Sequence, residues 1–220
     1  MNISKEFSLE HFCFDLDGTL IDSNKTIYET TIQTFKELGK GCDISEKDFV
    51  SHIGKHFVDI FKHFDVNVTD FDEFIQRYKQ IYFDFIEYSV VYPGVVNTLS
   101  ELNKQKVKIS LLTTKAQDQA DLIIDHFDLR KYFDFVMGRR DNFAHKPSPE
   151  PLIFICKEIK VDIDETLMVG DTELDIQCGK NAGAKTCGVL YGYRSLKLIE
   201  DEKPDLIIKS FDELLSLTGK

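Results

Sequence analysis

The sequence predicts an α/β protein, and two features of its apolar pattern lead to that class. Short apolar segments alternate with helical patterns along most of the chain. A single long stretch, residues 24–92, breaks this alternation and carries helical patterns instead. Because alternating strands and helices fold into a parallel sheet covered by helices, we expect a parallel-sheet core with a separate helical unit inserted into it.

Six apolar segments are predicted to form the strands of the core. Each is short and apolar over most of its length, which is typical of strands buried on both faces of a sheet. The predicted strands are residues 11–16, 106–113, 134–138, 165–171, 184–192 and 204–210. The predicted helices around them are residues 94–105, 115–127, 149–160, 173–182, 194–201 and 211–218.

The stretch between the first two strands is too long to be a plain loop of a compact domain. It carries several stripes of apolar and aromatic side chains at helical spacing, and the turn sequence YPGV at 92–95 marks its end. We therefore expect residues 23–92 to form a helical cap inserted after the first strand. Residues 1–22 and 93–220 are expected to form a Rossmann-like core domain.

The composition argues against several classes of partner. The chain has 220 residues and a net charge of −11, which disfavours nucleic acid and anionic membrane surfaces. Its first eleven residues, MNISKEFSLEH, lack the pattern of a signal peptide, and no apolar run approaches the ~18 residues of a membrane span. The five cysteines include no CxxC pair, so we expect free thiols and a cytoplasmic location. No protein partner is inferred.

Polar side chains that could take part in binding or catalysis follow four of the predicted strands. A carboxylate pair at one strand end could simply belong to a solvated turn. In an open parallel sheet, however, ligands bind beyond the carboxyl ends of the strands, so groups from several strand ends meet at one edge. The groups expected there are Asp15, Asp17, Thr113, Thr114, Lys115, Lys146, Asp171 and Asp175.

These residue types together indicate phosphoryl chemistry at a Mg²⁺ site. Several carboxylates in one pocket raise each other's pKa unless a cation lies among them. Mg²⁺ is held in proteins by a few carboxylates together with a substrate phosphate. A lysine and a threonine hydroxyl beside the ion would neutralise and position a phosphoryl group, and a carboxylate near the phosphorus can attack it.

Four motifs resemble those of the haloacid dehalogenase-like hydrolases. They are DLDGTLIDS, LLTTK, HKPSPEP and VGDTELDIQCGKNAGAKT, and their order, their spacing and the helical insertion match over essentially the whole chain. The C-terminal third, with GKNAGAKTCGVLYGYRS and PDLIIKSFDELLSL, is similar to the phosphoglycolate phosphatase group. The resemblance implies a Mg²⁺-dependent phosphatase that hydrolyses a small phosphorylated metabolite through an aspartyl-phosphate.

The resemblance also assigns roles to the acidic residues. Asp15 would be the nucleophile and a metal ligand through its side chain. Asp17 would protonate the leaving oxygen and then take a proton from water, since an acid in one half-reaction is the base in the other; its backbone carbonyl would bind the metal. Asp171 would be a further metal ligand. Asp175 would lie outside the ligand shell and orient a water or the lysine.

The phosphoryl group itself would be held by the remaining motif residues. The resemblance implies that Thr113 and Thr114 bind the phosphoryl oxygens together with backbone amides. Lys146 would neutralise charge on both the nucleophile and the phosphate, and so act in catalysis and in binding. Gly18 would allow the backbone to turn past the two aspartates.

Substrate selection is expected to lie in the cap. The loop SHIGKHFVD at 51–59 places Lys55 and His56 beside Gly54, where they could bind the carboxylate of a small acid such as phosphoglycolate. They could equally be exposed residues at the start of a helix. The two readings stay open on the sequence alone.

Three alternatives to a phosphoglycolate phosphatase were considered. The motif Thr113-Thr114-Lys115 replaces the Thr-Asn-Lys of many phosphoglycolate phosphatases and also occurs in a related pyrophosphatase group, so inorganic pyrophosphate is an alternative substrate. A nucleotidase or phosphosugar phosphatase of the same superfamily is another. A receiver-like signalling domain that carries phosphate on an aspartate is disfavoured, because receivers lack the long insertion and the Asp-x-Asp-Gly-Thr spacing.

Overall fold

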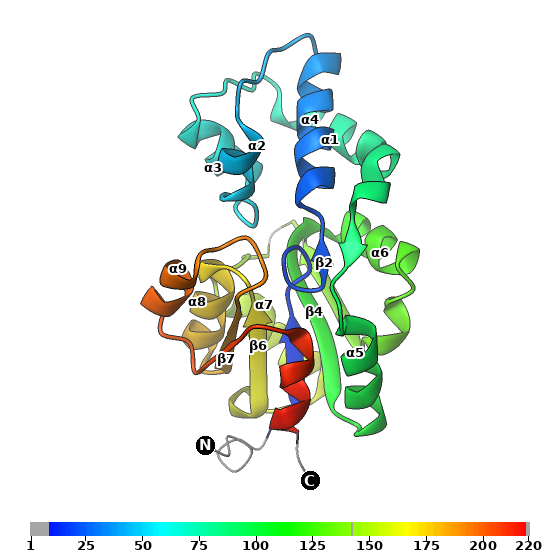
Figure 1. Ribbon diagram of the computed structural model, residues 1–220, viewed down its shortest axis with the longest axis vertical. Helices are drawn as coiled ribbons and strands as arrows, with labels where there is room; N and C mark the ends of the chain where they lie inside the picture. Colours follow the sequence, from blue (N-terminus) through cyan, green and yellow to red (C-terminus); the bar gives the residue numbers. More distant parts are fainter. Residues whose placement is uncertain (1–8, 142, 219–220) are drawn as a thin grey trace. The chain divides into compact units, whose positions relative to one another are not determined.

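The computed structural model describes residues 9–141 and 143–218. It confirms the α/β fold class, because the core is a six-stranded parallel sheet with the order β5-β4-β1-β6-β7-β8 (Figure 1). The strands are β1 (His11–Phe14), β4 (Lys108–Ala116), β5 (Phe135–Arg139), β6 (Thr166–Gly170), β7 (Lys185–Val189) and β8 (Leu206–Ile208). The side chains of β1 are fully buried, as expected for a central strand covered on both faces.

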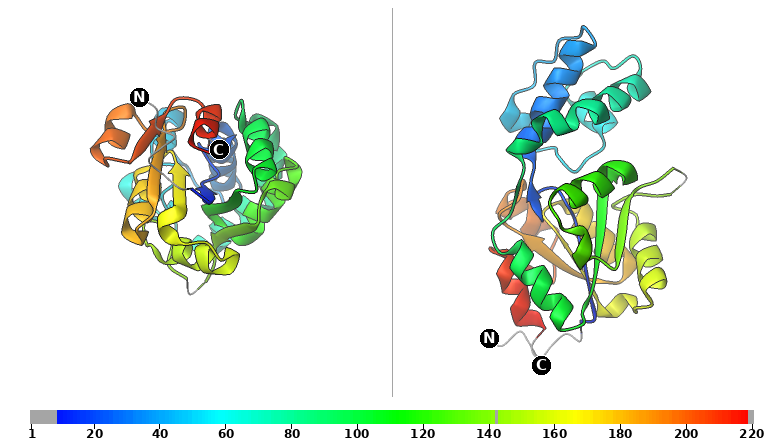
Figure 2. Two further views of the ribbon diagram at one scale, coloured as in Figure 1. Left: turned by 90° about the horizontal axis from the view of Figure 1, so that it is seen from below. Right: turned by 90° about the vertical axis from the view of Figure 1, so that its right-hand side faces the viewer.

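Helices cover both faces of this sheet (Figure 2). One group contains α5 and η5, which pack together, and the other contains α7 and α8, which also pack together. The α-helices of the core are α5 (Val95–Lys104), α6 (Gln117–His126), α7 (Glu150–Ile159), α8 (Glu173–Ala182) and α9 (Leu196–Asp201). The 3₁₀ helices are η3 (Arg130–Tyr132), η4 (Ile163–Glu165) and η5 (Phe211–Leu217).

Some boundaries differ from the sequence prediction. The strand predicted to end at residue 113 continues to Ala116 as β4, because Ala116 pairs with Arg139 of β5 after a shift of register that follows Leu112. The last helix is a 3₁₀ helix, a form that apolar spacing over seven residues does not distinguish from an α-helix.

The chain divides into two compact units, Met1–Leu20 with Val91–Lys220 and Ile21–Val90. We call them the core unit and the inserted unit. The inserted unit contains α1 (Asn24–Glu37), α2 (Glu46–Val50), α3 (Phe57–His63), α4 (Phe71–Ile81), η2 (Tyr82–Tyr88) and the short strand β2 (Ile21–Asp22), and the short strand β3 (Val90–Val91) spans its C-terminal boundary. The sequence indicated no strand between 24 and 92, because a two-residue strand such as β3 carries no periodic signal.

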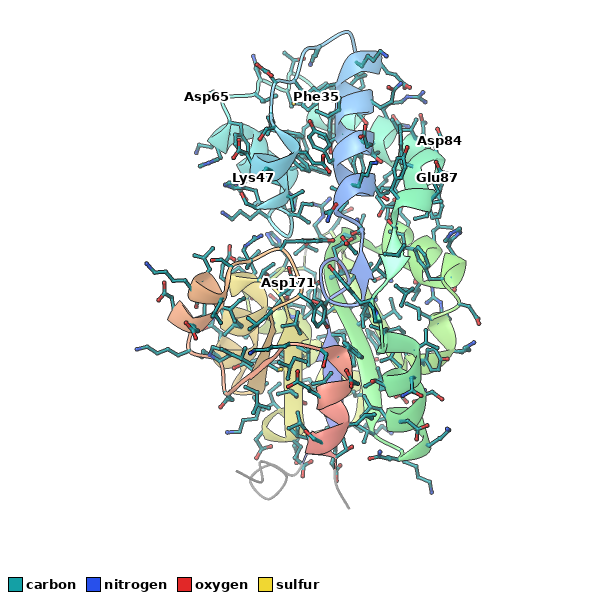
Figure 3. All side chains as sticks on the ribbon, viewed as in Figure 1. Phe35, Lys47, Asp65, Asp84, Glu87 and Asp171 are labelled. Atoms are coloured by element: carbon teal, nitrogen blue, oxygen red, sulfur yellow. The ribbon has the colours of Figure 1, made fainter. Side chains whose placement is uncertain are left out.

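Aromatic side chains form the interior of the inserted unit. Phe35 on α1 (Figure 3) lies with its ring centroid 5.1 Å from that of Phe61 and 4.9 Å from that of Phe74. All three side chains are almost completely buried. Contacts of this kind between α1, α3 and α4 make the predicted aromatic stripes the core of this unit.

Three expectations from composition can be compared with the structure. All five cysteines are free thiols. No helix in the described part of the chain is long and apolar enough to cross a membrane. The expected lack of a signal peptide concerns mostly residues 1–8, which lie outside the described residues.

Candidate active site

The carboxyl edge of the sheet brings together side chains from β1, β4 and β6. β1 ends at Phe14, and the next amide, that of Asp15, still donates to the carbonyl of Val169 on β6 at 3.0 Å. Asp171 follows the end of β6 directly (Figure 3). Asp15 and Asp171 are 156 positions apart in the sequence. They lie close together because neighbouring parallel strands end at the same edge of the sheet.

Lys146 links two of the acidic residues. Its Nζ donates to Oδ1 of Asp15 at 2.6 Å and to Oδ1 of Asp175 at 2.5 Å. All three side chains are buried. Burial alone lowers the pKa of Lys146, but the charges of Asp15 and Asp175 outweigh it and hold the pKa above its usual value. Lys146 is therefore an ammonium ion in this site.

One ammonium ion does not balance the carboxylates around it. Burial, against the opposing charge of Lys146 and together with the negative charges of Asp175 and Asp17, raises the pKa of Asp15 to about 7. Burial also raises the pKa of Asp171 well above its usual value, and Asp175 and Asp15 add to this effect. The site therefore has an excess of negative charge that a bound cation would offset.

The donor set fits a hard divalent cation. Oxygen atoms of Asp15, Asp171 and Asp175 all lie within 4.8 Å of one another. Oδ2 of Asp171 accepts a hydrogen bond from the amide of Tyr193 at 2.7 Å, whereas its Oδ1 is buried and has no hydrogen-bond partner among the described residues. A buried carboxylate oxygen without a donor is costly, and coordination to Mg²⁺ would satisfy it.

Asp175 is the least suited of the three to be a metal ligand. Its Oδ2 accepts from the amide and the hydroxyl of Thr172, at 3.0 and 2.7 Å, and its Oδ1 accepts from Lys146. Both oxygens are therefore engaged in strong hydrogen bonds at the start of α8. This geometry favours the predicted role of orienting the lysine.

Asp17 lies beside a lysine that the sequence analysis did not assign a role. Nζ of Lys115 lies 3.3 Å from Oδ2 of Asp17, and both side chains are nearly buried. Thr113 is buried and its Oγ1 accepts from the amide of Lys115 at 3.3 Å, while Thr114 is half-buried. These residues lie where the ladder between β4 and β5 is irregular, and such an irregularity changes the direction of side chains at a strand end.

Two glycines allow the backbone to approach Asp171 closely. Gly18 has φ +82°, and a Cβ there would lie 2.4 Å from Oδ2 of Asp171. A Cβ at Gly192 would lie 2.3 Å from Cβ of Asp171. Any larger residue at either position would displace the carboxylate, so the sequence DLDGT needs its glycine for space as well as for conformation.

Lys55 and His56 belong to the inserted unit. Both are half-buried, and the amide of Lys55 donates to the carbonyl of His52 at 3.1 Å. His56 has an extended backbone and directly precedes α3. The preceding Gly54 has φ +98°, so it makes the turn that brings the two residues next to α3.

The sequence analysis missed the contribution of the segment after β7. Tyr193 donates its amide to Asp171, and the guanidinium of Arg194 forms an ion pair with Glu173 at 2.8 Å. A backbone amide has no residue signature, and Arg194 and Glu173 are 21 positions apart. The sequence signal in this segment is YGYR at 191–194, part of the stretch that resembles the phosphoglycolate phosphatase group.

Comparison with known proteins places this geometry in a family. A family model described as haloacid dehalogenase-like hydrolase matches residues 12–189. The chain is 34% identical to the pyrophosphatase PpaX of Halalkalibacterium halodurans, over 94% of this chain and 95% of that protein. It is 33% identical to the pyrophosphatase PpaX of Bacillus mycoides, with the same two coverages.

A solved structure shows the same architecture. The crystal structure of a protein from Haemophilus somnus, described as a predicted phosphoglycolate phosphatase, superimposes with a TM-score of 0.83. It is 26% identical and covers 97% of this chain and 100% of its own. The solved structure thus has the same architecture. Its description and the names of the curated relatives both refer to enzymes that act on phosphate compounds.

Proposed function

Since the chain belongs to the haloacid dehalogenase-like hydrolase family and is a phosphatase, we propose that it hydrolyses a small phosphorylated metabolite with Mg²⁺ and through a phosphorylated Asp15. The observation that carries this proposal is the buried contact of Lys146 with Asp15 at 2.6 Å, next to Asp171, whose Oδ1 has no hydrogen-bond partner within residues 9–141 and 143–218. We further propose that the inserted unit, Ile21–Val90, acts as the cap over the core domain.

Asp15, Asp171 and the backbone carbonyl of Asp17 would hold the metal. When bound, Mg²⁺ would neutralise phosphate charge and polarise the phosphorus–oxygen bonds. The excess negative charge described for Asp15 and Asp171 supports this assignment. Asp175 would remain a positioning residue, because Lys146 and Thr172 already occupy its oxygens.

In the first half-reaction, a carboxylate oxygen of Asp15 would attack the phosphorus, and the bond from phosphorus to the leaving oxygen would break. Asp17 would give its proton to that leaving oxygen. Lys146 holds Oδ1 of Asp15, which would leave the second oxygen as the attacking atom. Thr113 and Thr114, with Lys146, would bind the phosphoryl oxygens as charge is redistributed among them.

In the second half-reaction, water would cleave the aspartyl-phosphate. The water oxygen would bond to phosphorus while Asp17 takes one proton from that water. The bond between phosphorus and the carboxylate oxygen of Asp15 would break, which releases inorganic phosphate. The neighbouring Lys115, whose Nζ lies 3.3 Å from Oδ2 of Asp17, would hold the Asp17 carboxyl in place between the two steps.

We propose inorganic pyrophosphate and phosphoglycolate as the first substrates to test. The curated relatives at 33–34% identity are named pyrophosphatases, which favours pyrophosphate. The solved structure at 26% identity is described as a phosphoglycolate phosphatase. Both compounds carry a second anionic group close to the scissile phosphate, a feature that Lys55 and His56 of the inserted unit could recognise.

The mechanism predicts that Asp15→Asn removes hydrolysis of p-nitrophenyl phosphate. The amide has the shape of the carboxylate but is not a nucleophile, so we expect a loss of at least about a thousandfold in kcat. Chelation of Mg²⁺ with EDTA should remove the activity of the unmodified chain as well. Both effects are measured by release of p-nitrophenol.

The matched control is Asp128→Asn, the same substitution at a carboxylate whose side chain is 80% exposed. It should retain activity. Full activity of Asp15→Asn, or of the unmodified chain in EDTA, would contradict the mechanism. A screen of phosphorylated metabolites that includes pyrophosphate and phosphoglycolate at fixed Mg²⁺ would then identify the substrate.

A further inference from the structure

The segment that follows β7, residues 190–194, packs directly on Asp171, and we call it the strap. The amide of Tyr193 donates to Oδ2 of Asp171 at 2.7 Å. A Cβ at Gly192 would lie 2.3 Å from Cβ of Asp171 and 2.5 Å from the carbonyl oxygen of Gly18. The backbone of the strap therefore lies against one side of the Asp171 side chain and holds one of its two oxygens.

The strap is fixed at several points of the core unit. The amide of Leu190 donates to the carbonyl of Ile208 at 3.0 Å, and the hydroxyl of Tyr191 donates to the carbonyl of Thr19 at 3.0 Å. At the other end, Nε of Arg194 donates to Oε2 of Glu173 at 2.8 Å. These contacts connect the strap to β8, to the turn after β1 and to the start of α8.

The ion pair at the end of the strap is unusual for its burial. Only 2% of the Arg194 side chain is exposed, and its Nη1 is buried with no hydrogen-bond partner among the described residues. A buried guanidinium with an unpaired nitrogen lowers stability. Its partner, Glu173, lies two residues after Asp171, so the pair joins the strap to the same short segment that carries the predicted ligand.

The contact of the strap with Asp171 limits which oxygens of this side chain can bind a cation. The amide of Tyr193 holds Oδ2, whereas Oδ1 has no hydrogen-bond partner in the part of the chain that the structure describes. Mg²⁺ has a strict, small octahedral shell and is usually held by single oxygens of one or two carboxylates, whereas Ca²⁺ takes a larger, flexible shell and accepts both oxygens of one carboxylate. A fixed, one-oxygen Asp171 therefore suits Mg²⁺ better than Ca²⁺.

We propose that Arg194 is a positioning residue that, through its ion pair with Glu173, fixes the strap on Asp171 and so sets the preference of the site for Mg²⁺ over Ca²⁺. This inference rests on the proposed function, because it requires the metal to bind at Asp171. Neither Arg194 nor Glu173 touches the metal or the substrate in this scheme. Loss of the ion pair would free the strap, and Asp171 could then offer both oxygens.

The test measures metal affinity without substrate. The midpoint of thermal unfolding is recorded against MgCl₂ and against CaCl₂ concentration, and each dissociation constant follows from the stabilisation. In Arg194→Met we expect the dissociation constant for Mg²⁺ to rise about tenfold, as for other residues that orient a metal ligand. The constant for Ca²⁺ should change less, so the Mg²⁺/Ca²⁺ affinity ratio should fall severalfold.

Two further variants make the result specific. Glu173→Gln keeps a hydrogen-bond acceptor and should lower the same ratio with less risk to folding. Arg130→Met is the matched control. Arg130 also pairs with acids, Asp121 at 2.7 Å and Asp125 at 2.8 Å. It precedes β5, the outermost strand on the side of the sheet away from β7 and β8. Its ratio should equal that of the unmodified chain. Far-UV circular dichroism and the metal-free midpoint show whether each variant is folded.

The outcomes separate this inference from the proposed function. If the unmodified chain shows no stabilisation by Mg²⁺, the proposed metal site is wrong, and this inference fails with it. If the unmodified chain binds Mg²⁺ but Arg194→Met and Glu173→Gln keep its Mg²⁺/Ca²⁺ ratio, the inference alone is overturned. A proportional loss of both metals would likewise overturn it, because that result indicates general loosening without selectivity.

Discussion

Lys146 shows how much of the site depends on single charged atoms. Its Nζ lies within 2.6 Å of two carboxylates, and only 3% of its side chain is exposed. A compact ammonium with three donors can serve both acids and still direct a donor to a substrate oxygen, whereas the larger planar guanidinium of arginine could not be placed there in the same way. The charge of one side chain thereby orients both Asp15, the proposed nucleophile, and Asp175 on α8.

At the same scale, His11 predicts how stability depends on pH. It is fully buried in β1, with Nδ1 3.1 Å from Oγ1 of Thr166 and Nε2 2.7 Å from Oγ of Ser110. Burial lowers its pKa to about 3, although the charge of Asp134 acts in the opposite direction. The folded chain thus keeps His11 neutral at pH values where the unfolded chain protonates it.

Because the folded pKa is lowered, the contribution of His11 is present above about pH 6.5 and is lost as the pH falls toward 3. The loss is about 1.4 kcal/mol per pH unit, or about 2 kcal/mol between pH 6.5 and 5. His11→Gln retains polar atoms but does not titrate. Urea unfolding at several pH values should therefore show that the unmodified chain loses about 2 kcal/mol more than His11→Gln over this range; parallel curves would contradict the assignment.

Residues at strand ends were predictable from the sequence, and their partners across the fold were not. The edge rule for parallel sheets brings Asp15 and Asp171 together from their positions after apolar segments. No local pattern in the sequence distinguishes the partners of Lys115 and Arg194 from those of other lysines and arginines. Their roles depend on which acid they face, Asp17 or Glu173, and only the tertiary structure decides that.

At the scale of elements, α8 is both a structural helix and part of the site. Its start is fixed by Asp175, whose Oδ2 accepts from the amide and hydroxyl of Thr172, and its end by Gly183 with φ +85°. The sequence predicted residues 173–182, and the helix has these bounds. Start and stop signals of this kind are local, so they can be detected without knowledge of the fold.

Short or irregular elements could not be predicted in this way. The strand β4 continues to Ala116, although the sequence pattern placed Thr113 at the end of the strand and Lys115 at the start of the next helix. The two-residue strands β2 and β3 pair only with each other, and nothing in their composition sets them apart from a turn. In both cases the pairing partner, and not the local sequence, determines the strand.

The double role of α8 predicts the effect of Asp175→Asn. The amide can still accept from Thr172, but it removes one of the two carboxylates that hold Lys146. We expect kcat to fall about 10- to 100-fold, as for other residues that orient a catalytic group, because Lys146 is no longer held in place. Helix stability should fall by about 1 kcal/mol. Hydrolysis kinetics and thermal unfolding measure the two effects separately.

The control for Asp175→Asn is Glu213→Gln at the start of η5. Oε1 of Glu213 accepts from the amide of Ser210 at 2.9 Å and from its hydroxyl at 3.2 Å, so the local arrangement is similar, but no catalytic residue is attached to it. Glu213→Gln should lose a similar amount of stability and keep its kcat. Equal kcat values for the two variants would mean that Asp175 acts only as a helix cap.

At the scale of the whole molecule, the inserted unit leaves and re-enters the core at adjacent points. The carbonyl of Leu20 accepts from the amide of Tyr92 at 3.0 Å, and the strands that flank the insertion in sequence, β1 and β4, are neighbours in the sheet. The core sheet is therefore continuous across the insertion. Such an arrangement lets the inserted residues vary without changing the strand ends that carry the chemistry.

This separation predicts how Lys55→Ala/His56→Ala should behave. If Lys55 and His56 bind the second anionic group of the substrate, their loss should raise KM for pyrophosphate or phosphoglycolate by about tenfold or more, the scale of one lost charge-assisted hydrogen bond. p-Nitrophenyl phosphate has no such group, so its kcat/KM should stay within about tenfold. Steady-state kinetics on the three substrates measure the change in preference.

The matched control is Lys47→Ala/Lys62→Ala, which removes two positive charges from α2 and α3 of the same unit, at least as many as Lys55→Ala/His56→Ala removes. If substrate recognition depends on the positions of Lys55 and His56 beside Gly54, the control should keep its preference. Losses of equal size on all three substrates would exclude a role in selection. A change of preference in the control as well would instead indicate long-range attraction of anions by the whole unit, which falls with added salt because exposed charges are screened.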